Sequence, residues 1–206
     1  MYRTFGKRLL DLALTIPALI LLAPLFALLA LLVRLKLGLP VLFRQQRPGL
    51  FGQPFTIYKF RTMTDARDTR GDLLPDAERL TPFGCFLRSI SLDELPELFN
   101  VLKGEMSLIG PRPLLMRYYP YFTDTERVRF LMRPGITGWA QIHGRNTVPW
   151  DERLAYDVWY YENCTLFLDI KIGLMTIGKV LKREDISPDP NSDLPGYDLD
   201  VERSML

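Results

Sequence analysis

The chain has 206 residues, enough for one domain with an appendage and a substantial core. Its formal net charge is only +2, which argues against a general nucleic-acid binder, so the positions of the basic residues matter more than their number. The single histidine, His143, and the two cysteines, Cys85 and Cys164, follow no metal-ligand or disulfide spacing. A His/Cys metal site is therefore not expected, and any metal would be a hard cation held by carboxylates.

The N-terminal part of the chain is the most apolar. From Leu12 to Val33, 22 residues carry no charge. A helix that rises about 1.5 Å per residue would be long enough there to cross a hydrocarbon layer of roughly 30 Å. The run is too long for the apolar region of a cleaved signal peptide, and it continues past its only small-x-x-small pattern. The sequence therefore predicts a membrane segment.

Two topologies fit this segment. Basic residues flank both of its ends: Arg3, Lys7, Arg8, Arg34 and Lys36. Such charge is typical of a cytoplasmic flank. Pro24, near the middle, removes a backbone donor and predicts a bend, and two arms of about ten residues each are too short to span. The residues favour equally a re-entrant hairpin and a helix that crosses once with a tolerated proline.

Beyond residue 38 the sequence predicts a mainly helical α+β domain. Two apolar runs around "RPGLFG" (residues 47–52) predict a β-hairpin. The polar, proline-bearing segment 64–82 predicts a loop, and the glycine-punctuated segment 133–146 predicts a loop with a short strand. Helices are predicted over three ranges: 91–103, 123–132 and 149–163.

The last part of the chain divides into a helix and a tail. Residues 166–183, "LFLDIKIGLMTIGKVLKR", predict an amphipathic helix, which could pack in the core or lie on the membrane surface. Residues 185–206 are acidic and proline-rich, and we expect them to be partly disordered. The predicted organisation is a membrane helix over 1–38, a main domain over 39–184 and a tail over 185–206.

The stretch "SLDELPEL" (residues 91–98) sets two carboxylates, Asp93 and Glu94, side by side before a proline. Ser91 and Glu94 fit a capping box, in which the serine caps the amide of Glu94 and the glutamate reaches back. The same geometry would place Asp93 in the first turn of a helix, where the helix dipole stabilises an ionised carboxylate. Such a group can act as a covalent nucleophile, while Glu94 could hold Mg²⁺ together with substrate phosphates. The residues alone leave both interpretations open.

Phosphate chemistry also needs positive partners. Five basic residues stand in settings defined by glycine, proline or a strand: Lys59, Arg61, Arg88, Arg112 and Arg145. Arginine suits phosphate because its guanidinium binds bidentately. Spacing does not show that these residues converge, and each one alone fits a surface salt bridge. The sequence contains neither a P-loop nor a G-x-G-x-x-G motif, so nucleotide binding of those kinds is not supported.

Three blocks resemble the bacterial sugar transferase family. They are "KFRTM" (59–63), "SLDELPELFNVLKGEMSLIGPRP" (91–113) and "RPGITGWAQIHGRN" (133–146). This family consists of monotopic polyprenyl-phosphate hexose-1-phosphate transferases, also called phosphoglycosyl transferases. The order and spacing of the blocks are specific, and the resemblance covers roughly residues 1–183. The chain looks like the small, PglC-like form.

The resemblance implies a fold, a location and a reaction. The N-terminal helix would be re-entrant, and the catalytic domain would lie on the cytoplasmic face of the inner membrane with amphipathic helices at the interface. The enzyme would move a sugar-1-phosphate from a UDP-sugar to undecaprenyl phosphate, giving undecaprenyl-diphosphate-sugar and UMP at the start of glycoconjugate assembly. Small members often use N-acetylated UDP-sugars, which favours such a donor here. Membrane lipids would be partners, and an oligomer is possible.

The resemblance also implies residue roles. Asp93 would attack the sugar-bearing phosphorus, expel UMP and carry a phosphosugar-aspartyl intermediate, which the lipid phosphate would then attack. Glu94, together with Asp93, would bind the cofactor Mg²⁺. Four basic residues would bind or border the substrate: Lys59, Arg88, Arg112 and Arg145.

Two positions depart from the family pattern. We expect asparagine where His143 stands, so this histidine is not expected to be an essential base. The family often breaks the membrane helix with Ser-Pro, whereas this chain has Ala23-Pro24. Proline alone should bend the helix, but without a serine hydroxyl for the freed carbonyl.

Two other functions compete with the transferase. A membrane-anchored scaffold that recruits partners through amphipathic helices would depend neither on Asp93 and Glu94 nor on a divalent metal. A lipid-phosphate phosphatase with Asp93 as nucleophile would release free phosphate and ignore UDP-sugars.

Overall fold

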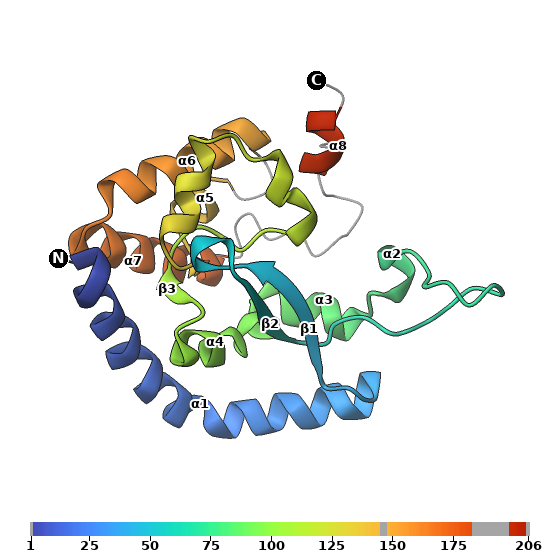
Figure 1. Cartoon of the computed structure of the whole chain (residues 1–206). Helices are drawn as coiled ribbons and strands as arrows, with labels where there is room; N and C mark the ends of the chain where they lie inside the picture. Colours follow the sequence, from blue (N-terminus) through green and yellow to red (C-terminus); the bar gives the residue numbers. More distant parts are fainter. Residues whose placement is uncertain (1, 145–147, 183–197, 205–206) are drawn as a thin grey trace.

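The computed structural model describes residues 2–144, 148–182 and 198–204. The long N-terminal helix α1 (Lys7–Leu37) borders the rest of the molecule, and a hairpin of β1 (Leu42–Pro48) and β2 (Pro54–Phe60) lies at the centre (Figure 1). Helices α6 (Trp150–Asn163) and α7 (Leu166–Lys182) lie across the hairpin from the C-terminal arm of α1. The predicted α+β class is confirmed at this level.

The other elements are short. The helices are α2 (Asp76–Arg79), α3 (Pro82–Ser89), α4 (Glu97–Lys103), α5 (Trp139–Ile142) and α8 (Leu199–Ser204). The strands β3 (Ser107–Ile109) and β4 (Gly135–Thr137) pair in parallel. A Cβ atom on Gly135 would lie 2.0 Å from the backbone nitrogen of Gly110, so only glycine lets these two segments approach so closely.

Several predicted elements are confirmed. The hairpin forms, with β1 and β2 antiparallel, and the helices predicted over 149–163 and 166–183 are α6 and α7. The helix predicted over 123–132 is instead a 3₁₀ helix, Glu126–Leu131. Helix α3 was not predicted, although the side chain of Thr81 caps it by accepting a hydrogen bond from the amide of Gly84 at 3.0 Å.

The capping box predicted at Ser91 is wrong. Ser91 has φ 55°, a left-handed conformation, and its side chain caps no amide. An N-cap residue is normally extended, because only then does its side-chain oxygen reach the amides of the first turn. A 3₁₀ turn, Leu92–Glu94, follows instead, and α4 begins only at Glu97. The two carboxylates therefore sit on a tight turn before the helix.

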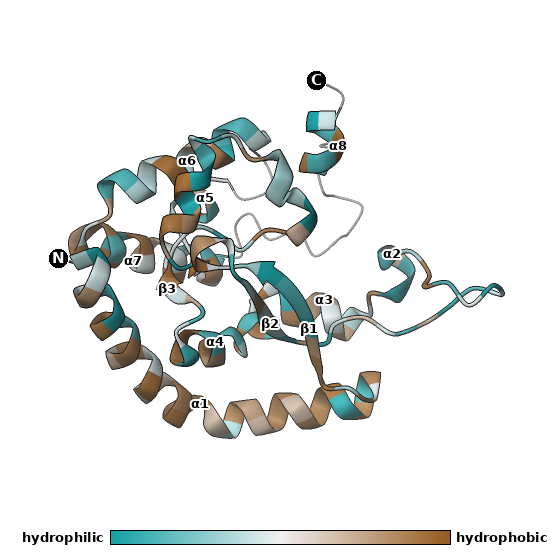
Figure 2. Ribbon diagram, viewed as in Figure 1, coloured by the Kyte–Doolittle hydropathy of each residue, from teal (hydrophilic) through white to brown (hydrophobic). Residues whose placement is uncertain are grey.

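Helix α1 bends near its middle, and its two arms follow two sides of the domain (Figure 1). Pro17 and Pro24 lie inside it, where each lacks the N–H of an intrahelical hydrogen bond and crowds the preceding turn. Figure 2 shows hydrophobic residues along most of its length. Many of these side chains are exposed: Leu9, Leu14, Ile20, Leu21, Leu28, Leu31 and Leu35. Among the described residues this is the one helix long and apolar enough to cross a membrane.

Buried charges fasten the N-terminal arm of α1 to the domain. The Nζ of Lys7 lies 2.5 Å from a carboxylate oxygen of Asp169 on α7 and donates to the hydroxyl of Tyr160 at 2.9 Å. One turn later, Asp11 accepts a hydrogen bond from the amide of Leu108 in β3 at 3.0 Å. All four of these side chains are buried, so these contacts fix where the arm meets the domain.

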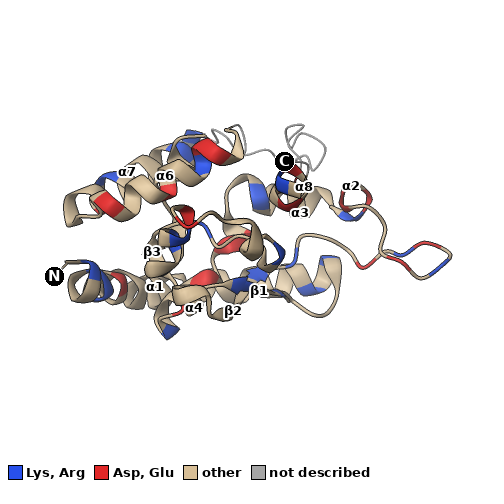
Figure 3. Ribbon diagram, turned by 45° about the horizontal axis from the view of Figure 1, so that its top comes forward, with Lys and Arg blue, Asp and Glu red and all other residues tan. Residues whose placement is uncertain are grey.

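The C-terminal arm is fastened by different residues. Arg61, after β2, donates to the carbonyl oxygens of Leu37 at 2.8 Å and Pro40 at 3.2 Å. The arm also joins a buried apolar cluster: Leu29, Val33, Leu37, Phe60 and Leu87. Both ends of α1 are therefore held by one domain, and the charged residues in Figure 3 lie mostly on that domain rather than on the middle of α1.

The C-terminal helix α8 docks on the domain. Leu199 is fully buried in a cluster of five other residues: Leu114, Tyr118, Phe122, Phe130 and Leu154. Arg203 donates to both carboxylate oxygens of Glu126, at 2.6 and 2.7 Å, and pairs with Asp151 at 2.7 Å. The disorder predicted for 185–206 falls mainly on residues outside the described ranges, whereas residues 199–204 are helical and anchored.

Leu199→Ala should release α8. Removing a fully buried leucine side chain typically costs about 2–5 kcal/mol, which is comparable to the free energy that holds so short a helix. Amide hydrogen exchange of residues 199–204 should accelerate accordingly. The matched control is Val201→Ala, because Val201 in the same helix is 37% exposed. Equal exchange in both variants would mean that Leu199 does not hold the helix.

Candidate active site

A cavity of about 1500 Å³ opens between the hairpin, the turn that carries Asp93 and the segments around α5 and α6. Five of the predicted site residues line it: Lys59, Arg88, Asp93, Glu94 and Arg112. The structure thus brings together residues that are up to 53 positions apart in sequence. The sixth, Arg145, lies outside the described residues.

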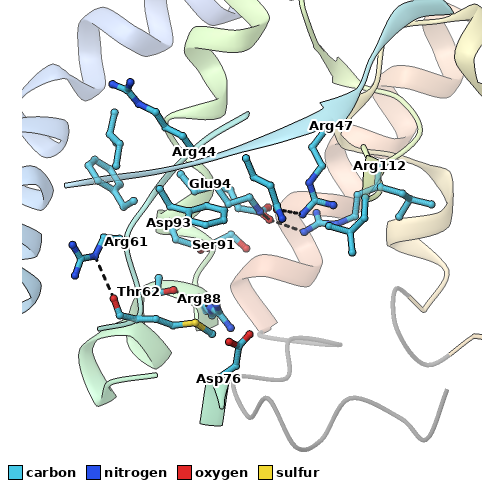
Figure 4. Close-up of a pocket in the computed structure, with 18 of the residues that line it drawn as sticks. Arg44, Arg47, Arg61, Thr62, Asp76, Arg88, Ser91, Asp93, Glu94 and Arg112 are labelled. Atoms are coloured by element: carbon cyan, nitrogen blue, oxygen red, sulfur yellow. Dashed lines mark hydrogen bonds and ion pairs between the residues drawn. The ribbon is translucent and has the colours of Figure 1, made fainter. Parts of the chain in front are cut away.

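Separate elements supply these side chains. Lys59 comes from β2, Arg88 from the last turn of α3, and Asp93 with Glu94 from the 3₁₀ turn. Arg112 follows β3 between two prolines. In Figure 4, Arg47 and Arg112 lie on one side of the carboxylate pair, and Thr62 and Arg88 lie on the other. The carboxylates therefore face cations from two directions.

Glu94 is the centre of an ion-pair network. Its Oε1 lies 2.6 Å from the Nζ of Lys59 and 2.9 Å from the Nη2 of Arg112. The charge of Glu94 raises the pKa of Arg112. Lys59 is also 3.3 Å from Glu97, the first residue of α4, which is 2% exposed. One carboxylate oxygen of Glu94 thus holds both the ammonium group of Lys59 and the guanidinium group of Arg112 at the cavity wall.

Asp93 is 8% exposed and borders the cavity. Burial raises the pKa of Asp93, and the adjacent Glu94 carboxylate raises that pKa further. Three cations lower the pKa of Asp93: Lys59, Arg88 and Arg112. A poorly solvated carboxylate with cations close by is suited to attack an electrophilic phosphorus, because little water must be removed from it first.

Arg88 is held at the cavity edge by the "KFRTM" segment. Its Nε donates to the hydroxyl of Thr62 at 3.2 Å. The hydrogen bond uses one edge of the guanidinium and orients the group beside the carboxylate pair (Figure 4). This contact links the "KFRTM" block to the end of α3, just before the block that carries Asp93 and Glu94.

Sequence reasoning missed a second set of polar residues in the same cavity: Arg47, Arg129, Gln141, Arg153 and Asp157. Arg129 and Asp157 form a buried ion pair at 2.9 Å, and Arg129 also donates to the carbonyl oxygen of Arg112 at 2.7 Å. Burial raises the pKa of Asp157 to about 6, although Arg129 and Arg153 oppose that rise. No spacing rule marks these residues. Asp157 alone carried a sequence signal, because an acidic residue stands there at helical spacing between Leu154 and Tyr160 on the buried side of α6.

His143 lies outside the lining of this cavity. Its ring packs on Trp139, with centroids 4.0 Å apart, and its Nδ1 lies 2.8 Å from the carbonyl oxygen of Trp139. The ring of Tyr156 also contacts the imidazole, with centroids 5.4 Å apart. These contacts give His143 a packing role; the expectation that it is not an essential base stays a prediction.

A divalent cation fits the carboxylate pair only with help from a substrate. Among the described residues, no group of three or more His, Cys, Asp or Glu side chains could hold a metal ion. Mg²⁺ commonly takes one or two protein carboxylates and completes its octahedral shell with phosphate oxygens and water. Asp93 and Glu94 supply that number of carboxylates, so the donor set fits Mg²⁺ bound together with a phosphate-bearing substrate.

A comparison with protein families matches residues 2–183 to the family described as bacterial sugar transferase. The chain belongs to this family. It is 54% identical over 180 residues to an uncharacterized sugar transferase, EpsL, of Bacillus subtilis, covering 87% of this chain and 89% of that protein. The family predicted from the three sequence blocks, and with it a transferase enzyme, is confirmed.

Two further relatives have names that state a reaction. The UDP-glucose:undecaprenyl-phosphate glucose-1-phosphate transferase of Caulobacter vibrioides is 40% identical, over 87% of this chain and 71% of that protein. A protein of the same name from Xanthomonas campestris pv. campestris is 41% identical over 87% of this chain. The match spans only 40% of the length of the Xanthomonas protein.

Glu97→Gln should change how stability depends on pH. Burial raises the pKa of Glu97 to about 7, against 4.5 in the ordinary case. The folded state therefore binds this proton more tightly than the unfolded state, and stability is lost as pH rises from about 4.5 to 7. The unfolding free energy of Glu97→Gln minus that of wild type should therefore increase by on the order of 3 kcal/mol from pH 4 to pH 8. The measurement is the difference in unfolding free energy between the two proteins at several pH values. A constant difference would contradict the assignment.

Proposed function

We propose that this protein transfers a sugar-1-phosphate from a UDP-sugar to undecaprenyl phosphate and releases UMP. The observation that carries the proposal is the buried Asp93 beside Glu94, in a cavity where Lys59, Arg88 and Arg112 face the pair. Two relatives named for this reaction with glucose support the choice of donor and acceptor. Neither a scaffold nor a phosphatase has a comparable observation in its favour.

In the first step, a carboxylate oxygen of Asp93 attacks the sugar-bearing phosphorus of the donor. A new O–P bond forms, and the bond from that phosphorus to the bridging oxygen breaks, so UMP leaves with the electron pair. Lys59, Arg88 and Arg112 offset the negative charge that the attacked phosphate and the leaving UMP share. Asp93 and Glu94 would hold Mg²⁺, which supplies further charge neutralisation when bound.

In the second step, an oxygen of the lipid phosphate attacks the same phosphorus. The bond to Asp93 breaks, and the carboxylate is regenerated as undecaprenyl-diphosphate-sugar leaves. The cavity offers the acceptor a way in, because its lining includes apolar residues that follow α1: Leu39, Pro40, Val41, Leu42 and Phe43. An acceptor whose tail stays in the membrane could reach Asp93 from that end.

We further propose that α1 is re-entrant and that the domain lies on the cytoplasmic face. Three observations support this topology: the bend in α1, the exposed apolar side chains along it, and the fastening of both of its ends to one domain. Helix α7 buries Leu168 and Ile172 in the core and exposes an apolar stripe: Leu166, Phe167, Ile170, Leu174 and Ile177. That stripe would lie in the membrane interface.

The covalent step predicts a trapped intermediate. Wild-type protein mixed with Mg²⁺ and a panel of UDP-sugars, without lipid acceptor, should gain the mass of one sugar phosphate. Asp93→Asn should gain nothing, because an amide is not a competent nucleophile here, and omitting the metal in the presence of chelator should suppress the gain. Intact-protein mass spectrometry makes the measurement, and the size of the mass gain identifies the sugar. We expect the gain with an N-acetylated UDP-sugar.

Asp124→Asn is the matched control, since Asp124 is fully exposed and outside the cavity lining. It should form the adduct like wild type. An adduct that persists in Asp93→Asn would remove Asp93 from the mechanism. Transfer to undecaprenyl phosphate with UMP release but without any adduct, even on rapid quenching, would favour direct displacement.

The re-entrant topology predicts that both ends of α1 face the cytoplasm. Single cysteines introduced at Arg3 and at Arg70 in a variant that lacks Cys85 and Cys164 should both be protected from an impermeant thiol reagent in whole cells. Both should react after the cells are permeabilised. Labelling of the Arg3 position in intact cells, with the Arg70 position still protected, would show that α1 crosses the membrane.

A further inference from the structure

One end of the cavity contains polar groups that the chemistry at Asp93 does not use. Gln141, on α5, lines the cavity and is 5% exposed. Neither its Oε1 nor its Nε2 has a hydrogen-bond partner among the described residues. A buried primary amide normally makes hydrogen bonds with both its oxygen and its nitrogen, because burial removes their hydrogen bonds to water and leaves an energetic cost if nothing replaces them. Gln141 therefore points to a ligand with one donor and one acceptor side by side.

Two guanidinium groups line the same cavity on neighbouring elements: Arg153 on α6, which packs against α5, and Arg129 on the 3₁₀ helix Glu126–Leu131, which packs against α6. Arg129 is 4% exposed, and only its Nη2 is engaged, with Asp157 and the carbonyl oxygen of Arg112. Its Nε and Nη1, and the Nε of Arg153, have no hydrogen-bond partner in the described part of the chain. Arg153 packs over the Trp150 ring at 4.3 Å, which fixes the plane of its guanidinium.

The charges at this end do not balance. Asp157 pairs with Arg129 and also acts on Arg153, whereas Glu126, the other carboxylate that acts on Arg129, is already paired with Arg203, so positive charge is in excess here. Arg129 is buried and Arg153 is half-buried, and arginines with spare N–H donors in such a place are a favourable environment for a phosphate, which brings negative charge and several acceptor oxygens. The charge excess and the unpaired donors point to the same class of ligand.

Arg112 joins this end to the reacting carboxylates. Its Nη2 lies 2.9 Å from Glu94, and its carbonyl oxygen accepts the hydrogen bond from Arg129 at 2.7 Å. Cations therefore border both ends of one cavity, with Arg112 between them. Two phosphates joined through a single bridging oxygen, as in a nucleoside diphosphate sugar, would fit this arrangement.

We propose that Arg129, Arg153 and Gln141 form the subsite for the nucleoside monophosphate half of the donor. The two guanidinium groups hold the phosphate that leaves with the nucleotide, and the amide of Gln141 turns into the cavity to pair with the N3–H and an adjacent carbonyl oxygen of uracil. A glutamine amide offers the complementary acceptor and donor on neighbouring atoms. The proposal rests on the proposed function for the identity of the nucleotide, but it concerns residues that take no part in the bond-making steps.

The test measures UMP binding directly by titration calorimetry in detergent. Gln141→Met keeps the size of the side chain and removes both hydrogen-bonding atoms, so the dissociation constant for UMP should rise about tenfold. The matched control, Gln46→Met, makes the same change at an exposed position outside the cavity lining, and its affinity should equal that of wild type. An unchanged affinity in Gln141→Met would overturn the assignment of the base.

A second variant tests the phosphate part. Arg153→Gln should weaken both UMP and inorganic phosphate, measured as a competitor of UMP, by about tenfold. Gln141→Met should leave the competition by inorganic phosphate as in wild type. Arg127→Gln is the control, because Arg127 lies outside the cavity lining and pairs with exposed Asp124. Equal phosphate competition in Arg153→Gln and wild type would overturn the phosphate assignment.

The remaining outcomes separate this proposal from the proposed function. If Gln141→Met keeps its UMP affinity but changes the ratio of KM values between UDP-sugars, Gln141 contacts the sugar and the subsite is wrongly assigned. If wild type forms the Asp93 adduct while both variants bind UMP as wild type does, only the subsite fails. If both variants lose UMP affinity while no donor yields an adduct and no UMP is released, the subsite stands and the proposed reaction fails.

Discussion

The structure depends on keeping two adjacent carboxylates, Asp93 and Glu94, poorly solvated at the edge of a cavity. Neighbouring negative charges raise each other's energy, and burial adds to the cost, so the arrangement needs cations close by. No single element of this chain supplies them. Lys59 arrives from the hairpin, Arg88 from α3 and Arg112 from the segment after β3, and Glu94 pairs directly with Lys59 and Arg112. Much of the central fold can be understood as the scaffold that brings these three positive charges to one turn.

A second layer of buried contacts holds the first in place. Arg129 anchors the carbonyl oxygen of Arg112 while pairing with Asp157 on α6, so the position of Arg112 depends on a helix some 40 residues away in sequence. Behind this segment, Leu199 of α8 packs against Leu114 and Phe130, which neighbour Arg112 and Arg129 in the chain. Helix α8 lies outside residues 2–183, which match the family. It nevertheless packs against the segment that carries Arg112.

Local patterns predicted the periodic elements and the motif residues, but not the contacts between distant segments. The hairpin, α6 and α7 follow from strand and helix periodicities. The family resemblance identified the cavity residues Lys59, Arg88, Asp93, Glu94 and Arg112. The capping box failed because the local Ser-x-x-Glu pattern says nothing about tertiary contacts. Glu94 pairs with Lys59 instead of capping the turn, and Ser91 adopts a left-handed backbone conformation. Gln141 and Arg153 escaped notice for a related reason: their unpaired buried atoms become visible only when α5, α6 and the cavity are assembled.

Helix α1 is attached to the domain at both ends, and its C-terminal attachment borders the cavity that contains Asp93. Lys7 and Asp11 fix one end of the helix to α7 and β3, while Arg61 fixes the other end by holding the carbonyl oxygens of Leu37 and Pro40. Arg61 also lines the cavity, and so do the residues that leave α1 toward β1. Residues at the end of the apolar helix and the two carboxylates therefore line the wall of the same cavity. In a re-entrant arrangement that wall would stand at the depth of the lipid headgroups, which is where a phosphate on a membrane-embedded chain and a water-soluble donor can both reach Asp93.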